Sequence, residues 1–239
     1  MPTWQEFSSS RFMTMNNVSG HLPVTMGIPN FKGYFSQNNG NFRVKININS
    51  FGFREDETID RANGRIWVIG DSMAFGWGVE EENRFSNILD HLLPHSRVFN
   101  ISIPTDFTGY NKLVTYAQKN GAKIDRLIIG VIMENDIQRY APIGNSVYTE
   151  ILPVAKIPTL SAFKYLLRNN SALYFLITSV IHRNFTFKDI AQKLGLIVNN
   201  YDIVKTNNYD TQKISASARQ LLLIAKKIKT LLLIIPSRG

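Results

Sequence analysis

An apolar run that ends abruptly in Gly-Asp-Ser is the feature that most constrains the fold of this chain. The run covers Arg65–Ile69 and is apolar from its second residue, and Gly70-Asp71-Ser72 follows it directly. Continuous apolar runs of this length are typical of strands that are buried on both faces of a parallel sheet. Such a strand delivers the residues that follow it to the edge of the sheet at which the strands end.

Further strands and helices alternate after this run. Apolar runs predict strands over Arg97–Ile101, Arg126–Met133 and Thr230–Ile235. Helical spacing of apolar residues predicts helices over Glu81–Leu93, Thr108–Asn120 and Ser215–Lys229. This alternation predicts βαβ units and therefore an α/β fold with a mainly parallel sheet.

The remaining segments are interpreted as additions to that sheet. Residues 1–46 are predicted to be an irregular N-terminal extension with at most two short strands, and residues 47–239 a single domain. Residues 141–212 show no central strand and are predicted to be a helical insertion that covers one end of the sheet as a lid. Its expected parts are helices over Ser161–Leu167 and Ser171–His182 and a polar loop over Asn199–Asp210.

Composition excludes several classes of site. The chain has no cysteine, which excludes disulfides, zinc–thiolate sites and a cysteine nucleophile. No apolar run approaches the roughly 18–20 residues that span a bilayer, so no transmembrane segment is predicted. No signal peptide is visible, and both a cytoplasmic and a periplasmic location are compatible with the sequence. No cofactor and no metal site is predicted.

Charge is distributed unevenly along the chain. Residues 1–150 hold 14 Lys and Arg against 15 Asp and Glu, whereas residues 151–239 hold 13 against 3. Such asymmetry occurs in proteins that bind nucleic acid or anionic membranes. No basic run is dense and no nucleic-acid motif is present, so we expect a solvated basic face, or an acidic remainder outside this sequence, and no nucleic-acid partner.

Polar residues follow three of the predicted strands, at the point where each strand ends. They are Gly70-Asp71-Ser72, the run from Asn100 to Asp106, and Glu134-Asn135-Asp136. Ligands of open parallel sheets bind at this edge, so we expect the three groups to meet there. Each group alone has a structural explanation, because such residues often form turns and helix caps and Asn100 simply ends a strand.

Together, these residues fit acyl transfer. The Ser72 hydroxyl is suited to attack a carbonyl, and the N–H groups of Ser72 and Thr105 with the Asn135 amide are suited to bind the developing oxyanion. Asp71 is expected to cap the following helix or to fix the turn. Gly76 and Gly78 indicate a tight backbone just after the serine. Other motifs do not fit: position 74 is alanine rather than the glycine of a Gly-x-Ser-x-Gly elbow, and no phosphate-binding or dinucleotide pattern is present.

The three groups resemble the motif blocks of the SGNH (GDSL-type) hydrolases, a family of esterases, lipases and sugar deacetylases. The resemblance implies a flavodoxin-like three-layer α/β/α sandwich, a catalytic Ser72, and oxyanion groups at Thr105 and Asn135. Gly70, Asp71, Asn100 and Asp136 would support them. The runs Asn49–Arg54 and Asn170–Tyr174 are also similar to bacterial members. Thr105 and Met133 replace glycines of the family, and the threonine Cβ is expected to crowd the hole or to demand a different backbone angle.

One block of the family has no counterpart here. Its Asp-x-x-His supplies the general base, and no histidine follows His182 in this sequence. His21, His91, His95 and His182 are weak candidates for a substitute base. Two explanations are open: the sequence is a fragment cut before that block, which we favour, or the protein has lost hydrolysis.

The sequence therefore predicts serine-dependent hydrolysis of acyl or acetyl esters of a carbohydrate or lipid. A polysaccharide O-acetyltransferase would use the same residues and is an alternative. A catalytically dead module that binds an acylated or glycan ligand is the third possibility.

Overall fold

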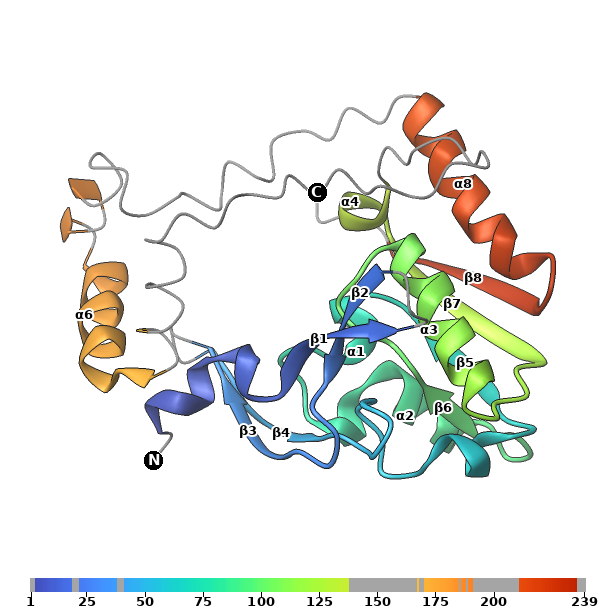
Figure 1. The fold of residues 1–239 in the computed structure, drawn as a ribbon, viewed down its shortest axis with the longest axis horizontal. Helices are drawn as coiled ribbons and strands as arrows, with labels where there is room; N and C mark the ends of the chain where they lie inside the picture. Colours follow the sequence, from blue (N-terminus) through green and yellow to red (C-terminus); the bar gives the residue numbers. More distant parts are fainter. Residues whose placement is uncertain are drawn as a thin grey trace.

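The computed structural model describes the backbone of residues 3–18, 22–37, 41–137, 167, 170–184, 186–187, 189–190 and 211–235 (Figure 1). Its centre is a four-stranded sheet in which every neighbouring pair is parallel. The strand order is β6-β5-β7-β8. The strands are β5 (Ile66–Ile69), β6 (Val98–Asn100), β7 (Arg126–Ile132) and β8 (Lys229–Ile235). The predicted parallel α/β sheet is thus confirmed, with strand ends shifted by at most one residue.

Helices connect these strands as the sequence predicts. They are α2 (Phe85–Leu92) between β5 and β6, α3 (Phe107–Lys119) between β6 and β7, and α8 (Thr211–Ala225) before β8. Helix α2 packs beside β6, and α3 packs against α8, where the Asn111 side chain donates to the Gln220 carbonyl over 3.1 Å. Two short helices, α1 (Ser72–Phe75) and α4 (Met133–Asp136), begin where β5 and β7 end.

Two helix boundaries differ from those predicted. The helix expected over Glu81–Leu93 is interrupted, because Arg84 is extended and separates the 3₁₀ turn η4 (Glu81–Asn83) from α2. The Arg84 side chain is buried and donates to the backbone of Arg54, a tertiary contact that no local pattern reveals. The helix expected over Ser215–Lys229 lies four residues earlier, and Lys229 belongs to β8.

The N-terminal segment is not an irregular extension, which corrects the prediction for residues 1–46. It begins with the 3₁₀ turns η1 (Trp4–Phe7) and η2 (Ser9–Arg11) and continues as two antiparallel pairs. The paired strands are β1 (Met13–Val18) with β2 (Leu22–Gly27), and β3 (Lys32–Ser36) with β4 (Arg43–Asn47). One further 3₁₀ turn, η3 (Ile59–Ala62), precedes β5. The prediction was wrong because each strand has only five or six residues and is stabilised by a pairing partner and by the core beneath it.

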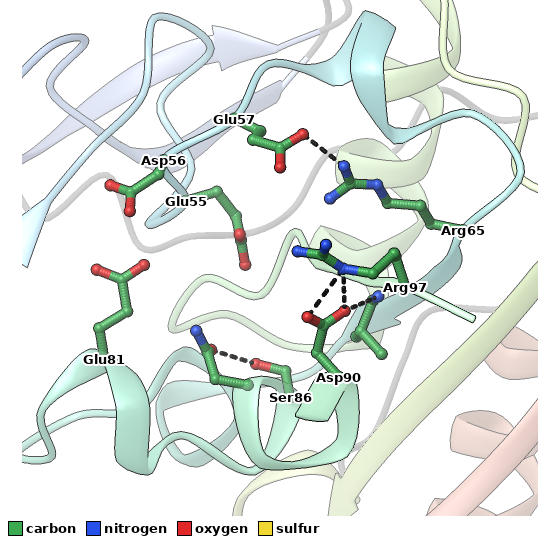
Figure 2. A pocket seen from close by; sticks show the side chains of 10 residues that line it. Glu55, Asp56, Glu57, Arg65, Glu81, Ser86, Asp90 and Arg97 are labelled. Carbon is green, nitrogen blue, oxygen red and sulfur yellow. Dashed lines mark hydrogen bonds and ion pairs between the residues drawn. The ribbon is translucent and has the colours of Figure 1, made fainter. Parts of the chain in front are cut away.

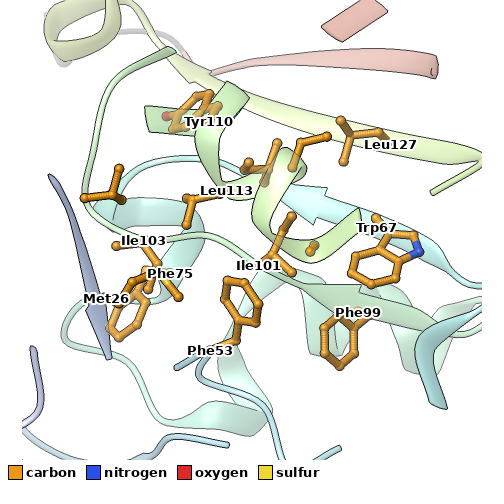
Figure 3. Packing of buried hydrophobic residues seen from close by; sticks show 14 of the residues in the cluster. Met26, Phe53, Trp67, Phe75, Phe99, Ile101, Ile103, Tyr110, Leu113 and Leu127 are labelled. Carbon is orange, nitrogen blue, oxygen red and sulfur yellow. The ribbon is translucent and has the colours of Figure 1, made fainter. Parts of the chain in front are cut away.

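A single hydrophobic core joins this segment to the parallel sheet. Met26 from β2 and Phe53 lie with Phe75 and Ile101 in one buried cluster (Figure 3). Trp67 and Phe99, on neighbouring strands, meet edge to face with ring centroids 4.9 Å apart. The hairpins therefore form part of the same folded unit as the strands that carry the candidate site.

Most of the predicted insertion lies outside the described residues, including positions 161–166 and the loop over 199–210. The described part holds α6 (Ala172–Arg183), which confirms the helix predicted over Ser171–His182. Ser171 caps it by accepting a hydrogen bond from the Tyr174 N–H over 3.1 Å. Among the described helices, none combines the length and the apolar character needed to cross a bilayer.

Phe12 offers a test of the shared core. Its ring is buried and packs against the rings of Phe31, Phe35, Phe75 and Trp77. We expect Phe12→Ala to lower the free energy of unfolding of the whole chain by about 3–5 kcal/mol. Urea unfolding followed by tryptophan fluorescence measures this. Phe187→Ala, at a half-exposed ring, serves as the control and should change stability little. An unchanged midpoint for Phe12→Ala would mean that residues 1–46 fold apart from the sheet.

Candidate active site

Ser72 is the first residue of α1 and lies two residues beyond the end of β5. The chain turns there because Gly70 has no side chain: a Cβ at this position would lie 2.5 Å from the Ala74 Cβ and 3.1 Å from the Gly130 carbonyl oxygen of β7. The close approach places α1 directly over β5 and β7. As the first residue of a helix, Ser72 has an N–H group without an acceptor inside that helix.

The turn around Ser72 is fixed on both sides. Asp71 caps α1 by accepting a hydrogen bond from the Met73 N–H over 2.9 Å, the role predicted for it. After the helix, the Trp77 N–H donates to the Ser72 carbonyl over 2.9 Å. Gly76 and Gly78 both have a φ of 83°, which side chains rarely tolerate. The tight backbone that the two glycines predict is confirmed.

Thr105 follows β6 and does not need the unusual backbone angle that we expected as one possibility. Among the described residues other than glycine, only Asn30 has a positive φ. The threonine side chain instead occupies space that Gly109 of α3 leaves open. A Cβ on Gly109 would lie 1.9 Å from the Thr105 hydroxyl oxygen and 2.7 Å from its Cβ. The side chain is thus accommodated against α3, and the Thr105 N–H is retained.

Asn135 lies on α4, which begins directly after β7. Its side chain lies outside the described part of the structure. The next residue, Asp136, is buried and accepts a hydrogen bond from the Ile132 N–H over 2.8 Å. The Tyr110 hydroxyl of α3 also donates to the Asp136 carboxylate, 3.4 Å from both oxygens. These bonds fix α4 to the end of β7 and to α3.

Three carboxylates lie next to the candidate residues at the strand ends. Asp71 precedes Ser72, Asp106 follows Thr105, and Asp136 follows Asn135. Burial first, and then the negative charges of Asp71 and Asp106, raise the pKa of Asp136 to about 7, although the hydrogen bonds from Ile132 and Tyr110 act in the opposite direction. The strands β6, β5 and β7 are parallel neighbours, so all three end at the same edge of the sheet. The turns that carry Ser72, Thr105 and Asn135 therefore lie at that edge.

Asn100 has a structural position in this edge. Its side-chain nitrogen donates to the Ala74 carbonyl over 2.8 Å and to the Ser86 hydroxyl over 2.9 Å, and its side-chain oxygen accepts from the Ser102 N–H over 2.8 Å. It is buried and holds α1, α2 and the end of β6 together. We expect it to support the site without touching a substrate.

Two of the four histidines lie away from this edge. His91 is in the last turn of α2 and His95 follows that helix, so both lie close to where β6 begins rather than where it ends. The side chains of His21 and His182 lie outside the described residues. Neither His91 nor His95 is placed to act as a base for Ser72.

A polar pocket of about 140 Å³ lies away from the edge of the sheet that carries Ser72 (Figure 2). It lies between the 55–57 segment, η4 and α2, and reaches the residues at which β5 and β6 begin. Two ion pairs line it, Arg65 with Glu57 and Arg97 with Asp90, and the lining residues Glu55 and Glu81 both pair with Arg84. In the part of the chain that the structure describes, no group of three or more His, Asp or Glu side chains is suited to hold a metal ion.

Four residues of the site were not singled out as functional from the sequence. Tyr110 and Gly109 face the strand ends from α3, whereas Arg54 and Arg84 lie beneath the Ser72 turn. Arg54 belongs to the Asn49–Arg54 run, whose likeness to bacterial SGNH hydrolases was the only signal for it. Nothing in the local pattern indicates the other three, because their roles depend on tertiary contacts.

Comparison with models of protein families, with curated proteins and with solved structures finds no match to this chain. The interpretation of the site therefore rests on the residues and geometry described above.

The contact between Thr105 and Gly109 predicts that the effect of Gly109→Ala on stability changes sign when Thr105 is replaced. Alanine is favoured over glycine within a helix by up to about 1 kcal/mol. In the native chain we expect Gly109→Ala to be destabilising by about 1–3 kcal/mol, because the new Cβ meets the Thr105 side chain. In a Thr105→Gly background the same change should be neutral or stabilising. Urea unfolding of the four proteins of this double-mutant cycle measures the coupling, and additive effects would contradict the contact.

The raised pKa of Asp136 predicts that the stability of the protein depends on pH. The folded protein raises the pKa of this carboxyl from 3.8 to about 7, chiefly through burial, so between these values the folded state holds a proton that the unfolded state releases. Its contribution to stability is therefore full at low pH and is lost as pH rises from about 4 to about 7.

We expect Asp136→Asn to remove this dependence. Relative to the variant, the native protein should lose unfolding free energy as pH rises through that interval. Urea unfolding of both proteins at several pH values measures the difference, and a constant difference would show that Asp136 ionises normally in the fold.

Proposed function

We propose that this protein is a serine ester hydrolase of the SGNH type. The observation that carries the proposal is the convergence of three strand-end turns, one with Ser72 at a helix N-terminus, one with Thr105 and one with Asn135. The parallel order of β6, β5 and β7 supports that convergence, because it puts the ends of the three strands at one edge of the sheet. A lone Gly-Asp-Ser would not support the same conclusion.

The strand order supports a ligand crevice beside Ser72. From β5 the chain moves to β6 on one side of the sheet, and it then returns to β7 on the other side. Ligands of open α/β sheets bind where the order reverses in this way. Ser72 follows β5 and Asn135 follows β7, so the two residues flank the point of reversal.

The same order supports the flavodoxin-like architecture that the family resemblance implies. Crossovers between parallel strands are almost always right-handed. The reversal of direction would then put α2 and α3 on opposite faces of the sheet, and α8 on the face of α3. The packing of α3 against α8 agrees with this arrangement.

The proposed reaction proceeds through an acyl-enzyme. The Ser72 oxygen attacks the ester carbonyl carbon while a general base takes the hydroxyl proton, and the carbonyl oxygen becomes an oxyanion. The N–H groups of Ser72 and Thr105 and the Asn135 amide bind that oxyanion. Collapse expels the alcohol, which takes the proton from the base, and water then releases the acid and regenerates the serine.

The family resemblance implies that the base is the histidine of an Asp-x-x-His block, and neither His91 nor His95, which lie near the start of β6, is placed to take that role. Substrates of this reaction class are acyl or acetyl esters, and we expect an esterified carbohydrate or lipid. A sugar hydroxyl in place of water would make the same acyl-enzyme a transferase, and formation of an acetylated glycan would identify that outcome.

Replacement of Ser72 tests the proposal. We expect Ser72→Ala in the full-length protein to reduce kcat for p-nitrophenyl acetate by about 10³-fold or more, because the nucleophile is lost. Ser50→Ala, which removes an exposed hydroxyl in the turn before Arg54, serves as the matched control and should retain the native rate. Equal rates for Ser72→Ala and the native protein would rule the mechanism out.

A further inference from the structure

Arg54 is a buried cation that none of the motif blocks explains. The residue is 1% exposed, and its guanidinium lies beneath the turn that follows Ser72. The group donates four hydrogen bonds, all to backbone carbonyls. The acceptors are those of Gly76 at 2.7 Å, Lys45 at 2.8 Å, Val79 at 2.9 Å and Phe75 at 3.5 Å.

Three of these carbonyls belong to the run that begins with Ser72. Phe75 is the last residue of α1, Gly76 is its cap, and Val79 ends the turn that Gly76 and Gly78 form. The fourth carbonyl, from Lys45, belongs to β4. The planar guanidinium thus ties the end of the Ser72 helix to a strand of the N-terminal hairpins.

The residues that precede Arg54 form a turn that positions its side chain. The Asn49 side-chain oxygen accepts hydrogen bonds from the N–H groups of Phe51 and Phe53, both over 3.0 Å, and its nitrogen donates to the Glu57 carbonyl over 2.7 Å. Gly52 has a φ of 85° and its carbonyl accepts from the Gly27 N–H over 3.0 Å. This fixed turn projects Arg54 under α1.

A second buried cation lies beside the first. Arg84 donates to the Arg54 carbonyl and to a Glu55 carboxylate oxygen 3.1 Å away, and that same oxygen accepts from the Asn100 N–H. Burial, and next the charge of Arg84, lower the pKa of Arg54 to about 10. Two adjacent buried cations are costly for a fold.

That cost argues against a role in stability alone. Whole buried ion pairs can often be replaced by apolar side chains of similar volume with no loss of stability. An apolar side chain cannot bind carbonyls, however, and a lysine cannot reproduce the planar fork that reaches several of them at once. The guanidinium therefore fixes the backbone conformation of the residues whose carbonyls it binds.

We propose that Arg54 is a positioning residue for Ser72, which it serves by fixing the backbone from the end of α1 to Val79. The effect on the backbone follows from the contacts alone, whereas its effect on catalysis rests on the function proposed above. Arg54 does not touch the substrate. It acts through the Ser72 helix, whose first N–H and hydroxyl are the groups proposed to meet the reacting carbonyl.

Hydrogen exchange tests the effect on the backbone. We expect Arg54→Lys and Arg54→Met in the full-length protein to accelerate amide exchange at least tenfold in the peptide that spans residues 72–79. Exchange of the β7 amides should stay unchanged. Arg97→Lys, which alters an exposed ion pair with Asp90, is the matched control and should leave both regions as in the native protein.

Kinetics with p-nitrophenyl acetate test the effect on catalysis. We expect kcat to fall about 10–100-fold in both Arg54 variants with KM nearly unchanged, because a small displacement of reacting groups has this effect.

Two results of the exchange experiment would overturn the proposal. One is amide exchange at the native rate over residues 72–79 in both the Lys and the Met variant. The other is an equal acceleration of amide exchange in β7, which would indicate a general loss of stability.

The two proposals fail in different ways. Should Ser72→Ala leave turnover unchanged, the proposed hydrolase function is wrong, and exchange over residues 72–79 still decides whether Arg54 holds the turn. Should turnover depend on Ser72 but not on Arg54, only the inference about Arg54 is wrong.

Discussion

The candidate site depends on the close approach of α1 to the two central strands. Gly70 has no side chain, and a Cβ at this position would lie 2.5 Å from the Ala74 Cβ and 3.1 Å from the Gly130 carbonyl oxygen. A larger residue at position 70 would therefore push α1 away from the sheet and move Ser72 away from the point at which the strand order reverses. The packing of Gly70, Ala74 and Gly130 thus determines where Ser72 lies, and the hydrogen bonds around it hold that position.

Those hydrogen bonds follow one pattern at the three strand ends. After each strand an aspartate accepts a backbone N–H: Asp71 from Met73, Asp106 from Gly109, and Asp136 from Ile132, at 2.8–2.9 Å. Carboxylate–amide bonds of this kind fix a turn while leaving other N–H groups in it available. The same arrangement buries Asp136, and that burial, with the nearby charges of Asp71 and Asp106, raises its pKa.

The sequence predicts the part of this structure that depends on local pattern. Continuous apolar runs predicted the parallel sheet, and glycine and aspartate after Ile69 predicted a capped, tight turn around Ser72. The hairpins of residues 13–47 were missed because short strands depend on their partners. Arg54, Arg84 and Gly109 were missed for a related reason. Arg54 and Arg84 contact residues that are distant in the sequence, and Gly109 contacts Thr105 in the turn before its helix. The break before α2 likewise follows from the buried Arg84 side chain rather than from helix propensity.

Covalent labelling tests whether Ser72 is an activated nucleophile. The full-length protein would be treated with a fluorophosphonate, which phosphonylates activated serines, and the modified peptide would be identified by mass spectrometry. We predict a single label on Ser72 that disappears in Ser72→Ala and forms more slowly in Arg54→Lys. A label on a different residue, or a native protein that remains unlabelled, would contradict it.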